Sequence, residues 1–445
     1  MMSKRNFLLV SMTIGIAVAG IPGAAMGQIP LAAIQAAIEE NGGSSDIRGF
    51  YEARAFRPFW TSGAQLRPEA RRLLRYFETA ELDDLKSRKY LTRSLRSAID
   101  KMSEEPSAEA VARTEQELSR SFAAYVQDLR KKKGEGLSFT DPALKPPSTD
   151  KLRILAEAAS ATSLASFVDK AGWAHPLYGQ LRIALATAPE GSRQEKLLRL
   201  NLERARHLPA ASSVGRHIVV DAAGARLMMY DKGSLQGTMK VVVGTEESPT
   251  PMMAGLIRYA SVNPYWNIPP NLVRNRIAPG VVANGTTWLK ARGYEVLSDW
   301  SDSAKVTDPS LVNWKAVAAG GMEVRVRQRP GPANAMGRVK FMFPNDHGVY
   351  LHDTPEKGLF GEDSRQFSNG CVRVENAARL ATWLFGKPLA TKSSVPEKNV
   401  DLPTPVPVYL TYFTVFPEGN RIAMRTDFYG RDGEAGAGKE MAGLQ

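Results

Sequence analysis

Two side chains in this 445-residue chain have the types and the spacing that covalent chemistry requires. Cys371 is the only cysteine, and His352 precedes it by nineteen residues. A free thiol has a pKa near 8.5 and is only a few per cent thiolate at neutral pH, so an adjacent imidazole that accepts its proton raises the reactive fraction. The pair predicts a thiol nucleophile, Cys371, with His352 as base and then acid. The alternative is that Cys371 is an unreactive apolar residue, as free cysteines commonly are.

The run that leads into His352 is typical of a β-strand. Side chains alternate along a strand, so Tyr350 and His352 share one face while Val349 and Leu351 point into the core. The same alternation turns Asp353 away from the imidazole. We therefore expect a backbone carbonyl, rather than this carboxylate, to hold His352.

The four residues that end at Cys371 predict a tight turn. Gly370 lets the backbone approach an acyl carbon closely, because it has no Cβ. The amides of Gly370 and Cys371 are then candidates for an oxyanion site, in which one donor is worth about 3 kcal/mol. We expect Ser368 and Asn369 to shape the turn rather than to contact a substrate.

The first residues indicate export. Two basic residues precede a short apolar run, Phe7 to Ala19, and the small residues Ala25 and Gly27 occupy positions −3 and −1 of a cleavage site. We interpret residues 1–27 as a signal peptide; the alternative is an uncleaved anchor, for which the apolar run is short. Export predicts a protein that acts outside the cytoplasm.

The remaining sequence predicts an α+β fold with several parts. Helical spacing and short β-rich runs divide the chain into a helical scaffold domain at 28–205, a β-rich catalytic domain at 206–398, a C-terminal strand segment at 399–432 that packs on either domain, and a flexible tail at 433–445. Inside the catalytic domain, residues from about 268 to 335 are rich in Pro and Gly. We expect them to form an irregular cap rather than a body with its own core, with Trp288, Trp300 and Trp314 as candidate anchors.

Composition excludes several classes of function. One cysteine permits neither an intramolecular disulfide nor a cysteine-based zinc cluster, and the five histidines form no His-x-x-x-His pair, so we expect no metal and no cofactor. Lys and Arg exceed Asp and Glu by 58 to 46, a net charge of +12, which favours an anionic partner. Export disfavours nucleic acid as that partner.

His352, the nineteen-residue spacing to Cys371 and the Ser-Asn-Gly-Cys turn together resemble the signature of the L,D-transpeptidase family with a YkuD-type catalytic domain. Asn369 replaces the second histidine of the usual signature and Asp353 replaces a glycine; both replacements resemble the large periplasmic branch that carries a capping insertion. Further segments similar to that branch are Tyr51–Trp60, Val262–Pro269, Pro330–Arg338, Phe360, Val408–Thr414 and Asp427–Asp432. The small peptidoglycan-binding module common in such proteins has no room between Ala186 and Asn201.

The resemblance implies a periplasmic transferase of cell-wall and cell-shape biosynthesis. Cys371 would attack the carbonyl between the third-position diamino acid and D-Ala of a peptidoglycan tetrapeptide stem, release D-Ala and form a thioester. An amine of a second stem would resolve the thioester to a 3→3 cross-link. The implied partners are donor and acceptor stems, with no stable membrane span after cleavage, and carbapenems are the implied inhibitors.

The resemblance also suggests substrate-binding roles. Tyr350 would form a wall near the nucleophile, Arg373 would bind a substrate carboxylate or make an internal salt bridge, and Trp266 would line the acyl-donor groove or simply pack. Two other functions stay open: an L,D-carboxypeptidase that uses water as acceptor, and a non-catalytic wall-binding scaffold.

Overall fold

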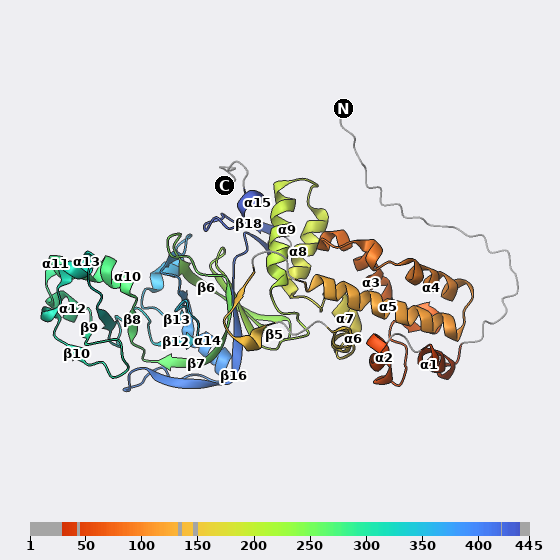
Figure 1. Ribbon diagram of the computed structural model, residues 1–445, viewed down its shortest axis with the longest axis horizontal. Helices are drawn as coiled ribbons and strands as arrows, with labels where there is room; N and C mark the ends of the chain where they lie inside the picture. Colours follow the sequence, from red (N-terminus) through yellow and green to blue (C-terminus); the bar gives the residue numbers. More distant parts are fainter. Residues whose placement is uncertain (1–28, 42–44, 132–135, 146–149, 420, 437–445) are drawn as a thin grey trace, which may run out of the picture.

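The structure is a computed structural model that describes residues 29–41, 45–131, 136–145, 150–419 and 421–436. A helical part forms one end of the molecule, a large sheet lies in the middle, and the cap forms the other end (Figure 1). The α+β prediction is confirmed. The expected signal peptide, residues 1–27, lies outside the described residues, as does most of the expected tail.

The helical part surrounds one long central helix, α5. Its helices are α1 (Leu31–Glu40), α2 (Ser45–Glu52), α3 (Pro68–Glu78), α4 (Arg93–Glu104), α5 (Ala108–Leu129), α6 (Lys151–Ala159), α7 (Leu164–Asp169), α8 (Pro176–Thr187) and α9 (Arg193–Arg206). Side-chain oxygens of Ser107 and Ser192 accept from backbone amides at the starts of α5 and α9, which satisfies donors that have no partner inside a helix. Helix α5 buries Leu118 and Phe122 completely, so the other helices pack around it.

The main sheet closes on itself. Its strands are β3 (Ser138–Phe139), β4 (His217–Asp221), β5 (Arg226–Asp231), β6 (Ser234–Gly244), β7 (Met253–Val262), β12 (Val339–Met342), β13 (Leu351–His352), β14 (Gln366–Ser368), β15 (Val372–Val374) and β16 (Lys398–Thr411). The order is β12-β13-β15-β6-β5-β4-β16-β7-β3, and β12 also pairs with β7. Strands β4, β5 and β6 form an antiparallel meander. Because β12 pairs on both sides, eight strands form a barrel-like ring around one core.

Helix α14 (Ala377–Phe385) packs on the core of this ring. The Asn376 side chain accepts from the Arg379 amide at 2.8 Å, and Gly386, at φ +71°, ends the helix. Leu380 and Leu384 are buried in the same cluster as the strand residues of the ring.

The cap is a folded body, and the expectation of an irregular cover is wrong. It contains β8 (Trp266–Ile268), α10 (Pro270–Leu272), α11 (Ala278–Asn284), α12 (Thr287–Ala291), β9 (Tyr294–Leu297), β10 (Val306–Thr307), α13 (Trp314–Ala318) and β11 (Arg325–Gln328), with strand order β10-β9-β11-β8. Ile268, Leu289 and Val326 belong to a separate buried cluster. Trp314 is 7% exposed and anchors this cluster, whereas Trp300 is 56% exposed and does not. Apolar residues that are scattered along the sequence thus form a core that no local hydrophobic periodicity predicts.

The chain after residue 398 joins the two main parts. Strand β16 lies between β4 and β7, so it is integral to the sheet. The hairpin of β17 (Val415–Glu418) and β18 (Arg421–Met424) follows, and Val415 and Phe416 are buried in the core of the helical part. The last described helix is α15 (Gly433–Gly436).

Two buried histidines meet where the helical part contacts the sheet. His175 Nδ1 accepts from the Leu177 amide at 3.2 Å, and His217 Nδ1 donates to the Gly215 carbonyl at 3.1 Å. The two Nε2 atoms lie 3.2 Å apart, so His175 donates and His217 accepts. Both rings are therefore satisfied as neutral imidazoles. Burial is the main reason that the pKa of each lies below its usual value. Both histidines thus have a structural role at this contact.

This pair predicts a loss of stability in mild acid. A histidine whose pKa is depressed in the folded state binds its proton more readily when unfolded, so folding stability falls as the pH drops below about 6.5. Between pH 7.5 and 5 each imidazole is expected to cost up to about 2 kcal/mol of unfolding free energy. Urea unfolding at both pH values measures the loss. The double variant H175Q/H217Q should show a clearly smaller loss, and an equal loss would contradict this assignment.

Candidate active site

Two parallel strands place the predicted site residues on one face. Leu351 pairs with Val372 and His352 pairs with Arg373 across β13 and β15. Leu351 and Val372 are fully buried in the ring core. In a parallel pair, residues in register point the same way, so the side chains on either side of the Leu351–Val372 pair point to the opposite face. Tyr350, His352, Cys371 and Arg373 therefore form a two-by-two array there.

His352 is held by the backbone, as expected. Its Nδ1 donates to the Asp353 carbonyl at 2.5 Å, which leaves Nε2 as the acceptor. The Asp353 carboxylate instead accepts from the Arg338 amide at 2.9 Å and from Lys357 at 2.7 Å. Burial, reinforced by the positive charges of Arg373 and Lys340, lowers the pKa of His352 to about 3. The ring is thus a neutral base at physiological pH.

The Cys371 thiol is protonated in the resting structure. Its Sγ donates to the Gly348 carbonyl at 3.6 Å, and the residue is partly exposed. Burial raises the pKa of Cys371 to about 11, against the opposing effects of hydrogen bonds from Tyr350 and the charge of Arg373. Thiol and imidazole therefore rest as a neutral pair rather than as thiolate and imidazolium.

Tyr350 lies beside the pair. Its ring lies 5.8 Å from that of His352, edge to face, and its backbone carbonyl accepts from the Val372 amide at 3.1 Å. Burial is the main reason that the pKa of Tyr350 is raised. The hydroxyl therefore stays protonated next to the sulfur.

The Ser368 hydroxyl closes the turn that carries Cys371. Ser368 Oγ donates to the Cys371 carbonyl at 2.5 Å and accepts from the Gly370 amide at 3.2 Å. Gly370 has φ +101°, a conformation that other residues rarely adopt. Its amide is engaged inside the turn, so the expected oxyanion role of Gly370 is not available in this arrangement. Asn369 is exposed at the tip of the turn.

Arg373 is a member of the array, whereas Trp266 belongs to the cap. Arg373 is ion-paired with Glu356, so the internal salt bridge considered from the sequence is present. Trp266 begins β8 at the root of the cap and packs against the cap core. Of the predicted residues, Trp266 is the one that lies outside the array and its turn, and Asn369 is exposed at the tip of the turn.

Lys340 is the residue that sequence reasoning missed. It pairs with His352 across β12 and β13, and its Nζ lies 5.6 Å from the centre of the Tyr350 ring. The ammonium donates to Glu397 at 2.8 Å and to the Tyr265 carbonyl at 3.3 Å, and the side chain is 7% exposed. The available signal was a lysine inside the apolar run 339–343, on the face that alternation assigns to His352.

Neither a metal-binding cluster nor a membrane-spanning helix occurs in the described ranges. Within residues 29–436, apart from the gaps given above, no group of three or more His, Cys, Asp or Glu side chains is arranged to hold a metal ion. Over the same ranges no helix has both the length and the apolar character to cross a bilayer.

Comparisons with known proteins agree with this architecture. Residues 215–408 match the L,D-transpeptidase catalytic domain (YkuD), and residues 45–185 match a scaffold domain. A Haemophilus influenzae protein, named as a candidate L,D-transpeptidase, is 28% identical over 405 residues, which cover 86% of this chain and 77% of the relative.

Two solved structures also overlap in part. An L,D-transpeptidase from Mycobacterium smegmatis is 12% identical, with 44% of this chain and 58% of that chain covered and a TM-score of 0.23. An Ldtfm–avibactam carbamoyl enzyme is 13% identical, with coverages of 46% and 52% and a TM-score of 0.22.

Fold and site together define a two-domain protein with a helical scaffold and a sheet-rich domain that presents a cysteine–histidine pair. Residues 215–408 belong to the L,D-transpeptidase family as its YkuD catalytic domain.

The neutral resting pair predicts the pH dependence of thiol reactivity. Only the thiolate is alkylated, so with a Cys371 pKa of about 11 the rate of modification by iodoacetamide should rise about tenfold per pH unit from pH 7 to 9. Lys340→Met should react more slowly than wild type at each pH. The lysine charge lowers the pKa of Cys371, so its loss leaves less thiolate. The exposed Lys398→Met is the matched control and should react like wild type. A rate that levels off below pH 8 would show a preformed thiolate instead.

Proposed function

We propose that the protein is a peptidoglycan L,D-transpeptidase that forms 3→3 cross-links through a thioester on Cys371. The observation that carries the proposal is the array on β13 and β15, where a neutral imidazole with its Nδ1 anchored on a carbonyl shares a face with the only thiol. Family membership supports the reaction class, and the anionic wall polymer suits the net charge of +12. The apolar first residues support action in the periplasm.

Acylation would proceed from the neutral pair. As Sγ attacks the carbonyl carbon before D-Ala, His352 Nε2 takes the thiol proton, so charge appears only when the substrate excludes water. The carbon–nitrogen bond then breaks, and the imidazolium returns the proton to the amine of the departing D-Ala. A thioester and a neutral imidazole remain.

Deacylation would repeat the sequence with the second stem. Its amine attacks the thioester carbon, His352 accepts a proton from that amine, and the sulfur leaves and is reprotonated. Water in place of the amine gives the L,D-carboxypeptidase reaction. The positive charges of Arg373 and Lys340 would stabilise the transient thiolate in both steps.

We assign the oxyanion contact to the backbone amide of Cys371. Gly370 shares a peptide group with that amide, and its own N–H is engaged by Ser368. Tyr350 would line the acyl-donor side next to the sulfur, and Trp266 would line it from the cap.

Replacing Cys371 or His352 should impair acyl transfer while the protein stays folded. Cys371→Ala should abolish product formation, and His352→Ala should slow acylation about 100-fold, the usual worth of a general base. Mass spectrometry of products from purified protein with defined tetrapeptide muropeptides measures both. Wild type should also gain one carbapenem adduct, at Cys371.

Three results would contradict parts of this proposal. If Cys371→Ala still forms cross-links, Cys371 is not the nucleophile. Stem hydrolysis without cross-linking would identify a carboxypeptidase. A folded wild-type protein that neither stem nor carbapenem acylates would identify a non-catalytic wall-binding scaffold.

We expect the cap to favour an amine over water as the acceptor. Its root contacts Lys340, the strand partner of His352: the Tyr265 carbonyl accepts from Lys340, and the Arg327 guanidinium lies 4.0 Å from the centre of the Tyr265 ring. Because the cap has its own core, it can move as one body about this root. We expect it to hold the donor stem and to exclude water from the thioester.

Replacing residues 268–326 by a short Gly-Ser connection should therefore raise the ratio of hydrolysed to cross-linked stems and weaken substrate capture. Product mass spectrometry measures the ratio, and the unfolding temperature of the ring domain serves as the folding control. An unchanged ratio in a folded protein would reduce the cap to a stabilising role.

A further inference from the structure

The last described segment of the chain contacts the loop behind the catalytic turn. The Tyr429 hydroxyl donates to the Gly244 carbonyl at 2.7 Å, and Arg431 donates to the Thr250 carbonyl at 3.0 Å. The Thr250 amide in turn donates to the Tyr429 hydroxyl at 3.4 Å. Residues far along the chain thus hold the loop between β6 and β7.

Thr250 transmits this contact to the turn. Its hydroxyl donates to the Gly370 carbonyl at 2.9 Å and accepts from the Gly244 amide at 2.9 Å, and the side chain is fully buried. The loop packs so tightly that a Cβ on Gly244 would lie 2.0 Å from the Ser248 carbonyl oxygen. Thr250 therefore has little freedom to move relative to the turn.

The orientation of one peptide group follows from this bond. The carbonyl of Gly370 and the amide of Cys371 belong to the same planar trans peptide, in which C=O and N–H point in opposite directions. A hydrogen bond that fixes the carbonyl therefore also fixes the direction of the Cys371 N–H. That N–H is the donor assigned above to the oxyanion.

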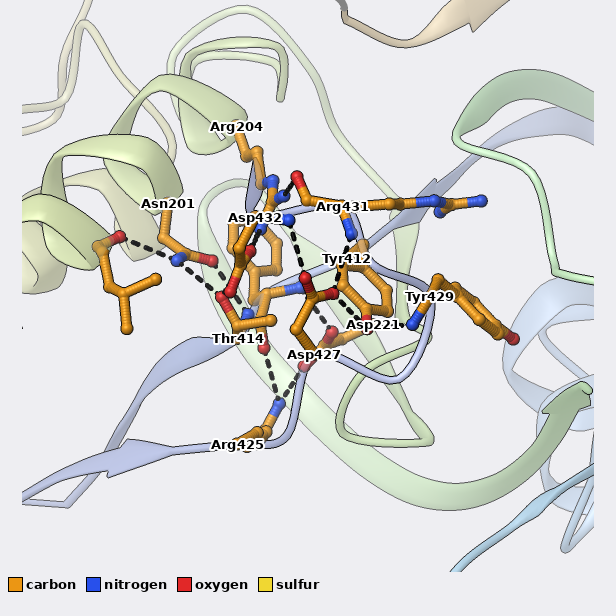
Figure 2. A network of polar contacts seen from close by, with 12 residues as sticks. Asn201, Arg204, Asp221, Tyr412, Thr414, Arg425, Asp427, Tyr429, Arg431 and Asp432 are labelled. Atoms are coloured by element: carbon orange, nitrogen blue, oxygen red, sulfur yellow. Dashed lines mark hydrogen bonds and ion pairs between the residues drawn. The ribbon is translucent and has the colours of Figure 1, made fainter. Parts of the chain in front are cut away.

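The segment is itself rigidly held. The Asp427 carboxylate accepts from the Tyr412 hydroxyl at 2.9 Å and from the amides of Arg431 and Asp432 at 2.9 and 2.8 Å (Figure 2). Tyr429 stacks on Tyr412, with ring centres 5.1 Å apart. These bonds fold the segment into a loop that presents the Tyr429 hydroxyl to Gly244.

The scaffold anchors the same loop. Arg204 of α9 pairs with Asp432 at 2.8 Å, and both side chains are almost completely buried. Thr414 donates to Asp432 at 3.0 Å and accepts from Asn201 of α9 at 3.0 Å (Figure 2). A continuous set of hydrogen bonds thus runs from α9 to the catalytic turn.

We propose that Tyr429 and Thr250 are positioning residues that aim the Cys371 amide at the developing oxyanion, and that Asp427–Asp432 braces them on scaffold helix α9. This inference rests on the proposed acyl-transfer function. It gives the scaffold domain a role in the rate of the chemical step.

The test compares two reactions of the same sulfur. Acylation by a carbapenem or a tetrapeptide stem develops an oxyanion, whereas alkylation by iodoacetamide does not. Tyr429→Phe removes one hydroxyl and keeps the ring stack, so acylation should slow about tenfold while KM for the stem and the alkylation rate stay within twofold of wild type. Thr250→Val should slow acylation more, and Thr250→Ser should restore it.

Tyr230→Phe is the matched control. This buried tyrosine of the same sheet donates its hydroxyl to the Met228 sulfur at 3.7 Å, and its loss should leave both reactions unchanged. If Tyr429→Phe is acylated at the wild-type rate, or if acylation and alkylation fall in parallel, the positioning role of Tyr429 is wrong. Neither result would contradict the proposed acyl-transfer function. A wild-type protein that is alkylated but never acylated would overturn the proposed function first.

Discussion

The parallel register of β13 and β15 is the constraint on which the site depends. Leu351 and Val372 share the core of the ring, and this shared burial forces their neighbours on both strands to the other face. A slip of one residue would turn Cys371 into the core and leave His352 without it. The register is supported on both sides, because β13 also pairs with β12 and β15 with β6.

Burial that stabilises this arrangement also sets the protonation states of the pair. Desolvation lowers the pKa of His352 and raises that of Cys371, so the strands hold a neutral pair instead of an ion pair. The nearby cations Lys340 and Arg373 are each compensated by a carboxylate, Glu397 and Glu356. On this account the site keeps its thiol unreactive until a substrate brings the carbonyl, and a protonated thiol is also less easily oxidised.

Sequence reasoning succeeded where a local periodicity carries the information. Alternation correctly placed Tyr350 with His352, excluded the Asp353 carboxylate and left a backbone carbonyl as the partner of the imidazole. It failed where contacts are long-range. The cap core joins residues between Ile268 and Val326. Lys340 reaches the site through strand pairing, and Thr250 reaches it through a side-chain hydrogen bond to the Gly370 carbonyl. Strand β16 begins at Lys398, although Pro403 and Pro405 favour a break; its register shifts between Asp401 and Val406 to accommodate them.

The measurement that tests the central claim most directly is the protonation state of His352 in the free protein. Long-range ¹H–¹⁵N correlation spectra of the imidazoles, assigned with His352→Gln, report both tautomer and charge as the pH changes. The account predicts a neutral ring with the proton on Nδ1 from pH 8 down to about pH 4, since its pKa is about 3. An imidazolium at pH 7 that is lost in Cys371→Ala would show a thiolate–imidazolium pair and would contradict the account.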